Sequence, residues 1–419
     1  MPASFSLTRR AALAGLFTAA ATPGSMLHAA EVAATMDELA KIADAPVLQL
    51  DFIKQPVVVE SIELLRNGKH WLLRTRSKDG LEVITVPHQD KMALAWPLLL
   101  KTVIPAFIGK DARKLEELQW QAYRSGSSYK MQGMLLWIAH MAVETALLEL
   151  MGRASGRPVA DFFGGRKQSD IAVYYASGNR GNTPAQEIEH LQKLVADSGV
   201  KALKFRLGAR MSRNADAPPN RSEQLIPLVR ESFGDAFTLY ADANSSYRDA
   251  KEAIRIGRIM EEHRYAFFEE PCEFDDLWST KQVADALTMP VAIGEQEYSM
   301  HRWRWCIAHR AADIMQPDLH YGGGFIRATK VARMAAAAGM TVVPHMSGGG
   351  LGYLDLVHFA SFTPNIGPHM EFKGNTDLPV VCSTSSLKCE NGFVRCPDGP
   401  GFGVDIDPAF IAKAKVVNP

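Results

Sequence analysis

Residues 237–244 read FTLYADAN, a short and mostly apolar run that closes on polar residues. This pattern is typical of a buried strand that brings a polar side chain to the end of a sheet. It returns farther along the chain, each time with carboxylates, in YAFFEEP (265–271) and PVAIGEQ (290–296). Because the helical stretch YRDAKEAIRIGRIMEEH (247–263) separates the first two runs, the predicted unit is a strand followed by a helix.

Eight such apolar runs follow one another in the second half of the chain, and helical stretches such as QEIEHLQKLVADSG and GFIRATKVARMAAAAG lie between them. Repeated alternation of strand and helix on this scale predicts an α/β fold with a parallel barrel. A doubly wound sheet is the alternative, although it rarely needs eight strands that nearly all end on a polar residue. The runs are IAVYYAS, ALKFRLG, FTLYADAN, YAFFEEP, PVAIGEQ, DIMQPD, MTVVPH and HMEF.

The polar residues at successive strand ends are regularly spaced. Their separations are 27, 26, 23, 27 and 26 residues, each about one strand–helix unit. In a barrel the carboxyl ends of all strands meet on one face, so we expect these residues to line one cavity. They are Asp242, Glu269, Glu295, Asp318, His345 and Glu371.

The first three of these residues are carboxylates on consecutive strands. Three negative charges in one place are costly unless a cation neutralises them. Since Asp242, Glu269 and Glu295 offer only oxygen ligands, they favour a hard ion such as Mg²⁺. Asn244 and Glu270 lie one or two residues away and are placed to contact the ligands. Pairing of the three carboxylates with lysine and arginine of the barrel is the structural alternative.

Asp318 and His345 fall on the next two strands, within reach of a hydrogen bond. A carboxylate that holds an imidazole fixes its tautomer and raises its basicity, which suits a general base. Most single histidines are structural, but the glycines of PHMSGGG open the loop that follows His345. We therefore expect His345 to be the base, and we expect His320 and His358, which lie off the strand-end register, to be structural or to lie at the rim.

Lys204 and Arg206 occupy alternate positions of KALKFRLG (201–208), so they share one face of the predicted strand. A guanidinium group stays protonated at any relevant pH, and Arg206 is therefore a poor general base. Its shape suits the binding of a carboxylate or of a hydroxyl-bearing substrate.

The first half of the chain has a different pattern. SIELLRNGKHWLLRTRSKDGLEVITV (61–86) reads as three strands, with turns at Asn67-Gly68 and Asp79-Gly80. From about Lys91 to Arg153 the pattern is helical and includes the run TVIPAFIGKDARKLEELQWQAY. A small meander followed by helices predicts an α+β domain.

The first 30 residues resemble a signal peptide. An Arg9-Arg10 pair precedes a mildly apolar segment and then small residues up to Ala30, which is the layout of a Tat-like signal. We expect export to the periplasm, or a cytoplasmic protein if the signal does not function. No other segment is expected to cross a membrane. Lysine plus arginine and aspartate plus glutamate both number 46, which argues against nucleic acid or a membrane as the main partner.

In order and spacing, YADAN, FFEEP, IGEQ, MQPD and VPH resemble the barrel motifs of the enolase superfamily, in its mandelate racemase-like branch. AVETALLELMGRASGRPVADFFGG resembles that family's last capping-domain helix, and NGFVRCPDGPGFGVDID its closing segment. The similarity runs from about residue 46 to the C-terminus. It implies a modified TIM barrel, (β/α)7β, over 166–385 and an α+β capping domain over 46–165. A C-terminal segment, 386–419, would return to the capping domain.

The resemblance also implies roles for individual residues. Asp242, Glu269 and Glu295 would bind one Mg²⁺ per subunit. Asp318 and His345 match the family's His-Asp dyad, and Glu371 matches the acid that hydrogen-bonds the substrate carboxylate. Lys204 and Arg206 fall on a Lys-x-Lys motif whose second lysine is arginine here. Family members assemble as homo-oligomers, and two loops of the capping domain, here near 53–60 and 86–93, shape their specificity.

The reaction shared by the family is removal of the proton α to a carboxylate. With Arg206 in place of a second basic lysine, His345 is left as the one base, which favours dehydration of a sugar acid to a 2-keto-3-deoxy acid. A racemase or epimerase is the first alternative, and a periplasmic acid-sugar binder without turnover is the second. His88, in the second specificity loop, and Glu297, near the rim, are candidate contacts for a small hydroxylated acid.

Overall fold

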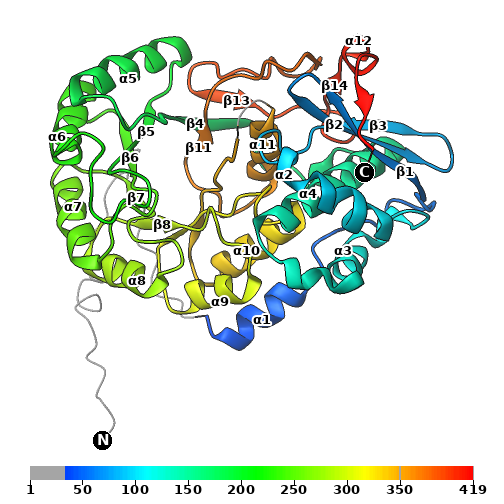
Figure 1. The fold of residues 1–419 in the computed structure, drawn as a ribbon, viewed down its shortest axis with the longest axis horizontal. Coiled ribbons are helices and arrows are strands. Elements are labelled where there is room, and N and C mark those ends of the chain that lie inside the picture. The colour runs from blue at the N-terminus through cyan, green and yellow to red at the C-terminus, as the bar shows by residue number, and fades with distance from the viewer. Residues whose placement is uncertain (1–33, 349–350, 419) are drawn as a thin grey trace, which may run out of the picture.

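The computed structural model describes residues 34–348 and 351–418. The predicted signal peptide (1–30) lies outside the described residues, so export stays a prediction. Figure 1 shows two lobes that pack against each other: a curled sheet surrounded by helices on the left, and a smaller lobe of strands and helices on the right, here called the cap.

The larger lobe is built on a parallel sheet. Within the described residues its strands follow the order β10-β9-β8-β7-β6-β5-β4-β11, and every neighbouring pair is parallel. The amide of Val342 in β10 bonds to Asn365, just before β11, at 2.9 Å, which joins the two ends of the sheet into a barrel. The strands are β4 (Asp170–Ala176), β5 (Ala202–Arg206), β6 (Thr238–Asp242), β7 (Phe267–Glu269), β8 (Val291–Ile293), β9 (Ile314–Met315), β10 (Thr341–Val342) and β11 (Met370–Phe372).

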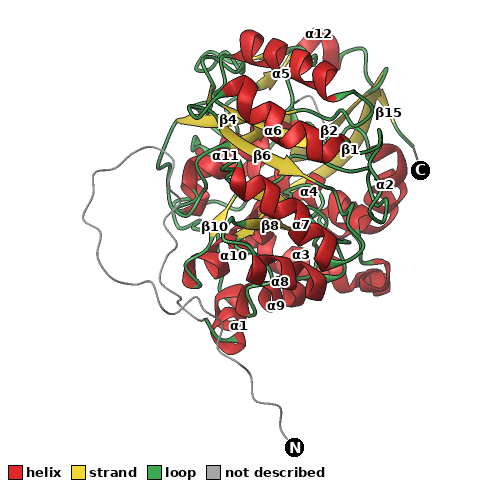
Figure 2. Cartoon of the chain, turned by 90° about the vertical axis from the view of Figure 1, so that its left-hand side faces the viewer, coloured by secondary structure: helices red, strands yellow, loops and turns green. Residues whose placement is uncertain are grey.

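Each predicted apolar run therefore contains one strand of the barrel, in the predicted order, and a helix follows each strand before the last. Figure 2 shows these helices covering the outside of the sheet. In α7, Asp249 caps the first turn, and buried Ala253, Ile256 and Met260 face the sheet with helical spacing. The helices are α5 (Pro184–Ser198), α6 (Arg221–Phe233), α7 (Ala250–Glu262), α8 (Leu277–Ala286), α9 (Met300–Ala308), α10 (Phe325–Ala337) and α11 (Gly352–Phe362).

The cap contains the predicted meander. Antiparallel strands β1 (Val59–Asn67), β2 (His70–Ser77) and β3 (Glu82–Thr85) form a sheet, with Asn67 opposite His70 at the first turn. The free edge of β1 pairs with β15 (Lys415–Val416), so the end of the chain returns to the cap. This topology and the barrel confirm the predicted fold class.

The helices of the cap differ from the prediction at one point. The expected helical run TVIPAFIGKDARKLEELQWQAY is interrupted between Ala106 and Ala112, because Gly109 adopts φ +74° and Asp111 caps a new turn. The helical segments are α2 (Met92–Leu98), a π-helical turn (Leu99–Val103), short 3₁₀ turns (Ile104–Ala106, Ala112–Lys114, Ser125–Met131 and Val159–Phe163), α3 (Leu115–Arg124) and α4 (Met134–Ser155). Helix α1 (Met36–Asp44) precedes them and packs against α9 and α10 of the barrel.

Helix α4 corrects the expectation that no later segment is apolar enough to cross a membrane. In the described part of the chain, α4 alone has the length and composition of a membrane span. However, 89% of its most apolar window is buried inside the protein, between the cap sheet and the barrel. The apolar character of α4 is accounted for by this position in the core.

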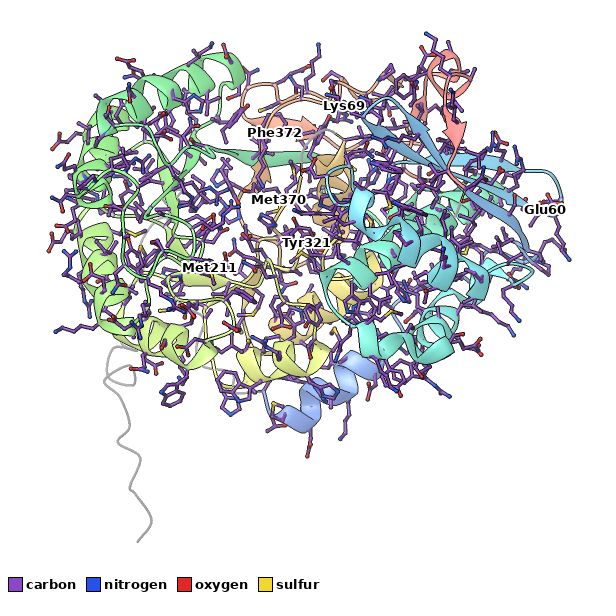
Figure 3. The ribbon with its side chains drawn as sticks, in the orientation of Figure 1. Glu60, Lys69, Met211, Tyr321, Met370 and Phe372 are labelled. Carbon is purple, nitrogen blue, oxygen red and sulfur yellow. The ribbon has the colours of Figure 1, made fainter. Side chains whose placement is uncertain are left out.

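The first of the two expected specificity loops is also corrected. Residues 53–60 do not form a loop over the barrel, because Val59 bonds to Lys110 and Val58 pairs with Asp111 across the cap. Glu60 lies at the outer edge of the cap in Figure 3, far from Tyr321 at the centre of the molecule. The segment is therefore a structural part of the cap.

The C-terminal segment runs over both lobes. Strand β13 (Phe393–Arg395) pairs with β4, while β12 (Val380–Val381) pairs with β14 (Asp405–Ile406), and α12 (Pro408–Ile411) precedes β15. All five cysteines lie in the described residues and all are free thiols.

Candidate active site

The ends of three neighbouring strands bring three carboxylates together. Asp242 and Glu269 are the last residues of β6 and β7, and Glu295 follows β8 by two residues. Ligand oxygens of all three lie within 4.8 Å of one another. Asp242 and Glu269 are fully buried, and Glu295 is partly exposed. The structure therefore assembles the predicted acidic cluster at the carboxyl end of the barrel.

Unusual backbone geometry follows each of these strands. Gly294 has φ +124°, and a Cβ there would lie 2.1 Å from the Trp303 ring, so only glycine lets the chain turn toward Glu295 at this point. Asn244 and Glu270 adopt φ +41° and +42°, which is uncommon for residues with a side chain. Such strain is typical of sites where surrounding structure fixes functional groups.

Lys204 lies in β5 and faces this cluster from inside the barrel. Its Nζ is 2.8 Å from both carboxylate oxygens of Glu269 and 3.0 Å from Oε1 of Glu371. Burial opposes the charge on Lys204, but Glu269 and Glu371 raise its pKa well above the ordinary value. Lys204 is therefore held as a cation.

Arg206, two residues farther along β5, forms a close ion pair with Oδ2 of Asp242. Its NH1 also donates to Oδ1 of Asn244 at 3.2 Å, and its Nε donates to the Ser177 carbonyl at 3.2 Å. Asn244 in turn donates from Nδ2 to Asp242 and to Glu270, at 3.1 and 3.2 Å. The Asn244 amide thus connects the cations of the site to its carboxylates.

The predicted Asp318–His345 pair forms on the opposite side of the cavity. Nδ1 of His345 is 2.7 Å from Oδ2 of Asp318, while Oδ1 accepts bonds from the Tyr321 amide and the Ser347 hydroxyl, at 2.8 and 3.0 Å. Nε2 of His345 is left facing Glu295, whose Oε2 lies 3.4 Å away. Burial opposes protonation of His345, but Glu295 raises its pKa above the ordinary value.

Glu371 lies in β11, between the two sides of the cavity. Its Oε2 accepts a 2.8 Å bond from the Met346 amide and lies 3.7 Å from Nε2 of His345. Burial would raise the pKa of Glu371, but Lys204 and Lys373 hold it well below the ordinary value. Glu371 is therefore ionised in this arrangement.

Two family models match most of this chain. The enolase C-terminal domain-like model matches residues 186–410, and the mandelate racemase/muconate lactonizing enzyme N-terminal domain model matches residues 61–164. The chain belongs to the mandelate racemase-like branch of the enolase superfamily.

Individual relatives agree with this assignment. An arabinonate dehydratase of Saccharolobus solfataricus is 27% identical, over 75% of this chain and 82% of its own length. The structure of a candidate racemase from Roseobacter denitrificans is 33% identical and superposes with a TM-score of 0.80, over 86% of this chain and 99% of its own. A family protein of Paracoccus denitrificans, solved in complex with magnesium, is 22% identical with a TM-score of 0.76, over 86% and 99% of the two chains.

The acidic cluster of this family member fits a divalent cation. Its donors are all carboxylate oxygens, which hard cations prefer. Oε2 of Glu295 is buried and lacks a hydrogen-bond partner, so it has a free position for a ligand. Asp242, Glu269 and Glu295 are therefore the residues that would hold the ion.

Two of the expected substrate-side residues lie differently from the prediction. Glu297 is bound to Arg302 at 2.8 Å and accepts a bond from the Ser299 amide at 2.7 Å, so both of its carboxylate oxygens already have protein partners. His88 is 3% exposed, stacks on the Tyr321 ring and meets the His320 ring edge-on. Burial and then His320 lower the pKa of His88 to about 3, so the ring is neutral.

Several residues of the site were not predicted from the sequence. Arg180, in the loop after β4, makes a close hydrogen bond to Asn244 and donates to the Leu207 carbonyl at 2.7 Å. Gln316 donates to Glu269 at 2.9 Å. Gln316 precedes Asp318 by two residues, so the alternation of side chains along a strand could have indicated it. Arg180 lies on a loop and had no such signal.

Proposed function

We propose that this enzyme dehydrates a sugar acid or related hydroxy acid to a 2-keto-3-deoxy acid, with Mg²⁺ as cofactor. One observation carries the proposal: the cavity offers a base on one side only. Nε2 of His345 is not bound by Asp318 and faces Glu295 across 3.4 Å, whereas Lys204 and Arg206 on the other side are both held as cations by carboxylates. The arabinonate dehydratase relative supports the same reaction class.

In the proposed mechanism His345 removes the proton α to the substrate carboxylate. Asp318 accepts a hydrogen bond from Nδ1–H, which sets the tautomer so that the neutral ring has its lone pair on Nε2. The same Nε2 then returns its proton to the departing β-hydroxyl, so the group serves first as base and then as acid. One imidazole is sufficient when the α-proton and the leaving hydroxyl lie on the same side of the substrate.

The opposite side of the cavity supplies charge. When bound, the metal ion supplies Lewis-acid stabilisation of the negative charge that develops on the substrate carboxylate. Lys204, fixed by Glu269 and Glu371, adds a permanent positive charge at this point. Glu371 is ionised, so it accepts hydrogen bonds here and would donate one to substrate only after taking up a proton.

Two alternative functions, an epimerase and a binder without turnover, lead to different expected results. The candidate racemase from Roseobacter denitrificans favours an epimerase, which would need Lys204 to lose its proton against two carboxylates. A binder without turnover would bind an acid sugar tightly and form no product at any pH, and His345→Ala would change nothing.

A screen of hydroxy acids with Mg²⁺ present tests the proposal. We expect one or a few acid sugars to yield a 2-keto acid, detected as its semicarbazone. Formation of an epimer without keto acid would support the racemase alternative. Binding without either product would support the binder.

We also propose that the protein is exported to the periplasm in folded form. The support is the Arg9-Arg10 pair ahead of a mildly apolar segment. Fractionation of cells that express the full chain should place it in the periplasm. Replacing both arginines by lysine should keep it in the cytoplasm, and an unchanged distribution would contradict export by this route.

A further inference from the structure

A tyrosine outside the predicted motifs lies beside the base. Tyr321 follows Asp318 by three residues, in the turn between β9 and α10, and is half-buried. Its ring centroid is 6.3 Å from that of His345. Figure 3 shows Tyr321 in the middle of the molecule, between the barrel and the cap. This position puts the side chain on the His345 side of the cavity.

The Tyr321 ring is held from both lobes. Its backbone amide is bonded to Asp318, which fixes the residue relative to the dyad. From the cap, the His88 ring stacks on it with a centroid distance of 5.4 Å and an interplanar angle of 9°. The loop after β10 passes close to His88, because a Cβ added at Gly348 would lie 3.2 Å from the His88 ring. The ring therefore has little freedom to turn away.

The Tyr321 hydroxyl is surrounded by groups that keep its proton in place. Burial, followed by the charges of Asp318 and Glu295, raises its pKa above the ordinary value. A phenol that stays protonated is a hydrogen-bond donor and cannot serve as a base.

We propose that Tyr321 positions the substrate by donating a hydrogen bond to its β-hydroxyl, and that His88 holds the ring in the required orientation. The inference rests on the proposed function and names a group that recognises the leaving hydroxyl. In a one-base dehydration this hydroxyl must lie near His345, because His345 returns the proton to it. A fixed donor on the same side orients the hydroxyl and supports the charge on its departing oxygen.

The test compares binding of two ligands, an acid sugar and its 3-deoxy analogue, by calorimetry with Mg²⁺ present. All variants carry His345→Ala so that neither ligand is converted. We expect the parent to prefer the hydroxylated ligand by about five- to tenfold, the contribution of one neutral hydrogen bond. Tyr321→Phe should abolish the preference. Tyr175→Phe, a half-buried tyrosine of β4 whose ring packs on Phe372, should keep it.

His88 is tested in the same assay. His88→Ala removes the stacking ring and should reduce the preference, and His88→Phe should restore it because the flat ring is kept. An unchanged preference in Tyr321→Phe would overturn the proposal. Because binding is measured without turnover, this result is independent of the wild-type reaction. An enzyme that forms no keto acid would instead contradict the proposed function.

Discussion

The two sides of the cavity are built from the same kinds of groups and do opposite things. On the β5 side, Lys204 and Arg206 are each paired with a carboxylate, and Lys204 is completely buried. On the β9–β10 side, Asp318 pairs with one nitrogen of His345 and leaves the other facing the cavity.

The difference shows how pairing decides chemistry. A lysine or arginine bonded to a carboxylate is held protonated and acts as a fixed charge. An imidazole bonded through one nitrogen has its tautomer set and keeps the second nitrogen for proton transfer. A sequence motif that contains two cations therefore does not by itself supply a second base.

The largest expected effect is a loss of kcat on the β9–β10 side, where Asp318 holds His345. His345→Ala should lower kcat about 10³-fold, within the range for loss of a general acid–base group. His309→Ala, an exposed histidine at the end of α9, is the matched control and should retain wild-type activity. Steady-state kinetics on the substrate found in the screen measures both. If His345→Ala keeps more than a tenth of kcat, the base lies elsewhere.

The next prediction concerns the effect of Mg²⁺ on the free energy of unfolding. Mg²⁺ at a hundredfold excess over its Kd should raise the free energy of unfolding by about 2.7 kcal/mol. Glu295→Gln should lose this effect, because Oε2 of Glu295 has no hydrogen-bond partner and is the ligand atom most available to the ion. Thermal unfolding with and without Mg²⁺ measures it. A full Mg²⁺ shift in Glu295→Gln would exclude Glu295 as a ligand.

Arg206→Lys tests whether the β5 side can be given a base. Loss of the planar contacts to Asp242 and Asn244 should lower kcat on the order of tenfold. A lysine at 206 would still face Asp242 and stay protonated, as Lys204 does beside Glu269 and Glu371. We therefore expect no exchange of the α-proton on the opposite face in ²H₂O, followed by NMR, in either Arg206→Lys or Arg206→Gln. Exchange that appears in Arg206→Lys and not in Arg206→Gln would contradict the account, because it would show that a lysine paired with a carboxylate still serves as a base.

The last prediction concerns stability alone, at the contact between the cap and α10 on the side of the Asp318–His345 pair. Glu144 of α4 is buried and accepts a 3.1 Å bond from the Ile326 amide in the first turn of α10. Burial raises the pKa of Glu144 from 4.5 to about 8, so the folded protein holds a proton that the unfolded chain releases across this window. Wild-type stability should therefore fall as pH rises from 4.5 to 8, relative to Glu144→Gln, by about 5 kcal/mol.

Denaturant unfolding of both proteins at several pH values measures this difference. Glu117→Gln, an exposed carboxylate on α3, should follow the wild type. Parallel pH profiles for wild type and Glu144→Gln would show that the Glu144 carboxyl titrates normally.

Much of the fold could be predicted because strand ends in a barrel repeat with a constant spacing. The sequence predicted that Asp242, Glu269, Glu295, Asp318 and His345 lie together, and the structure brings them into one cluster at the carboxyl end of the barrel. The register of β5 likewise put Lys204 and Arg206 on the inner face.

The positions that could not be predicted from the sequence belong to residues on loops and in the cap. Tyr321 and Arg180 reach the site from turns, whose direction is set by tertiary packing rather than by a period. Glu297 has the spacing of a rim residue, but its carboxylate forms an ion pair with Arg302. Residues 53–60 were expected to form a specificity loop, and the backbone bonds to Lys110 and Asp111 that fix them are long-range.

The most direct test of a single base is the reaction of the Mg²⁺-loaded enzyme in ²H₂O. The account predicts that the substrate yields a 2-keto-3-deoxy acid and that recovered substrate keeps its configuration at the α-carbon. Recovery of the deuterated α-epimer without keto acid would contradict it, because inversion requires a second base on the side where only Lys204 and Arg206 lie.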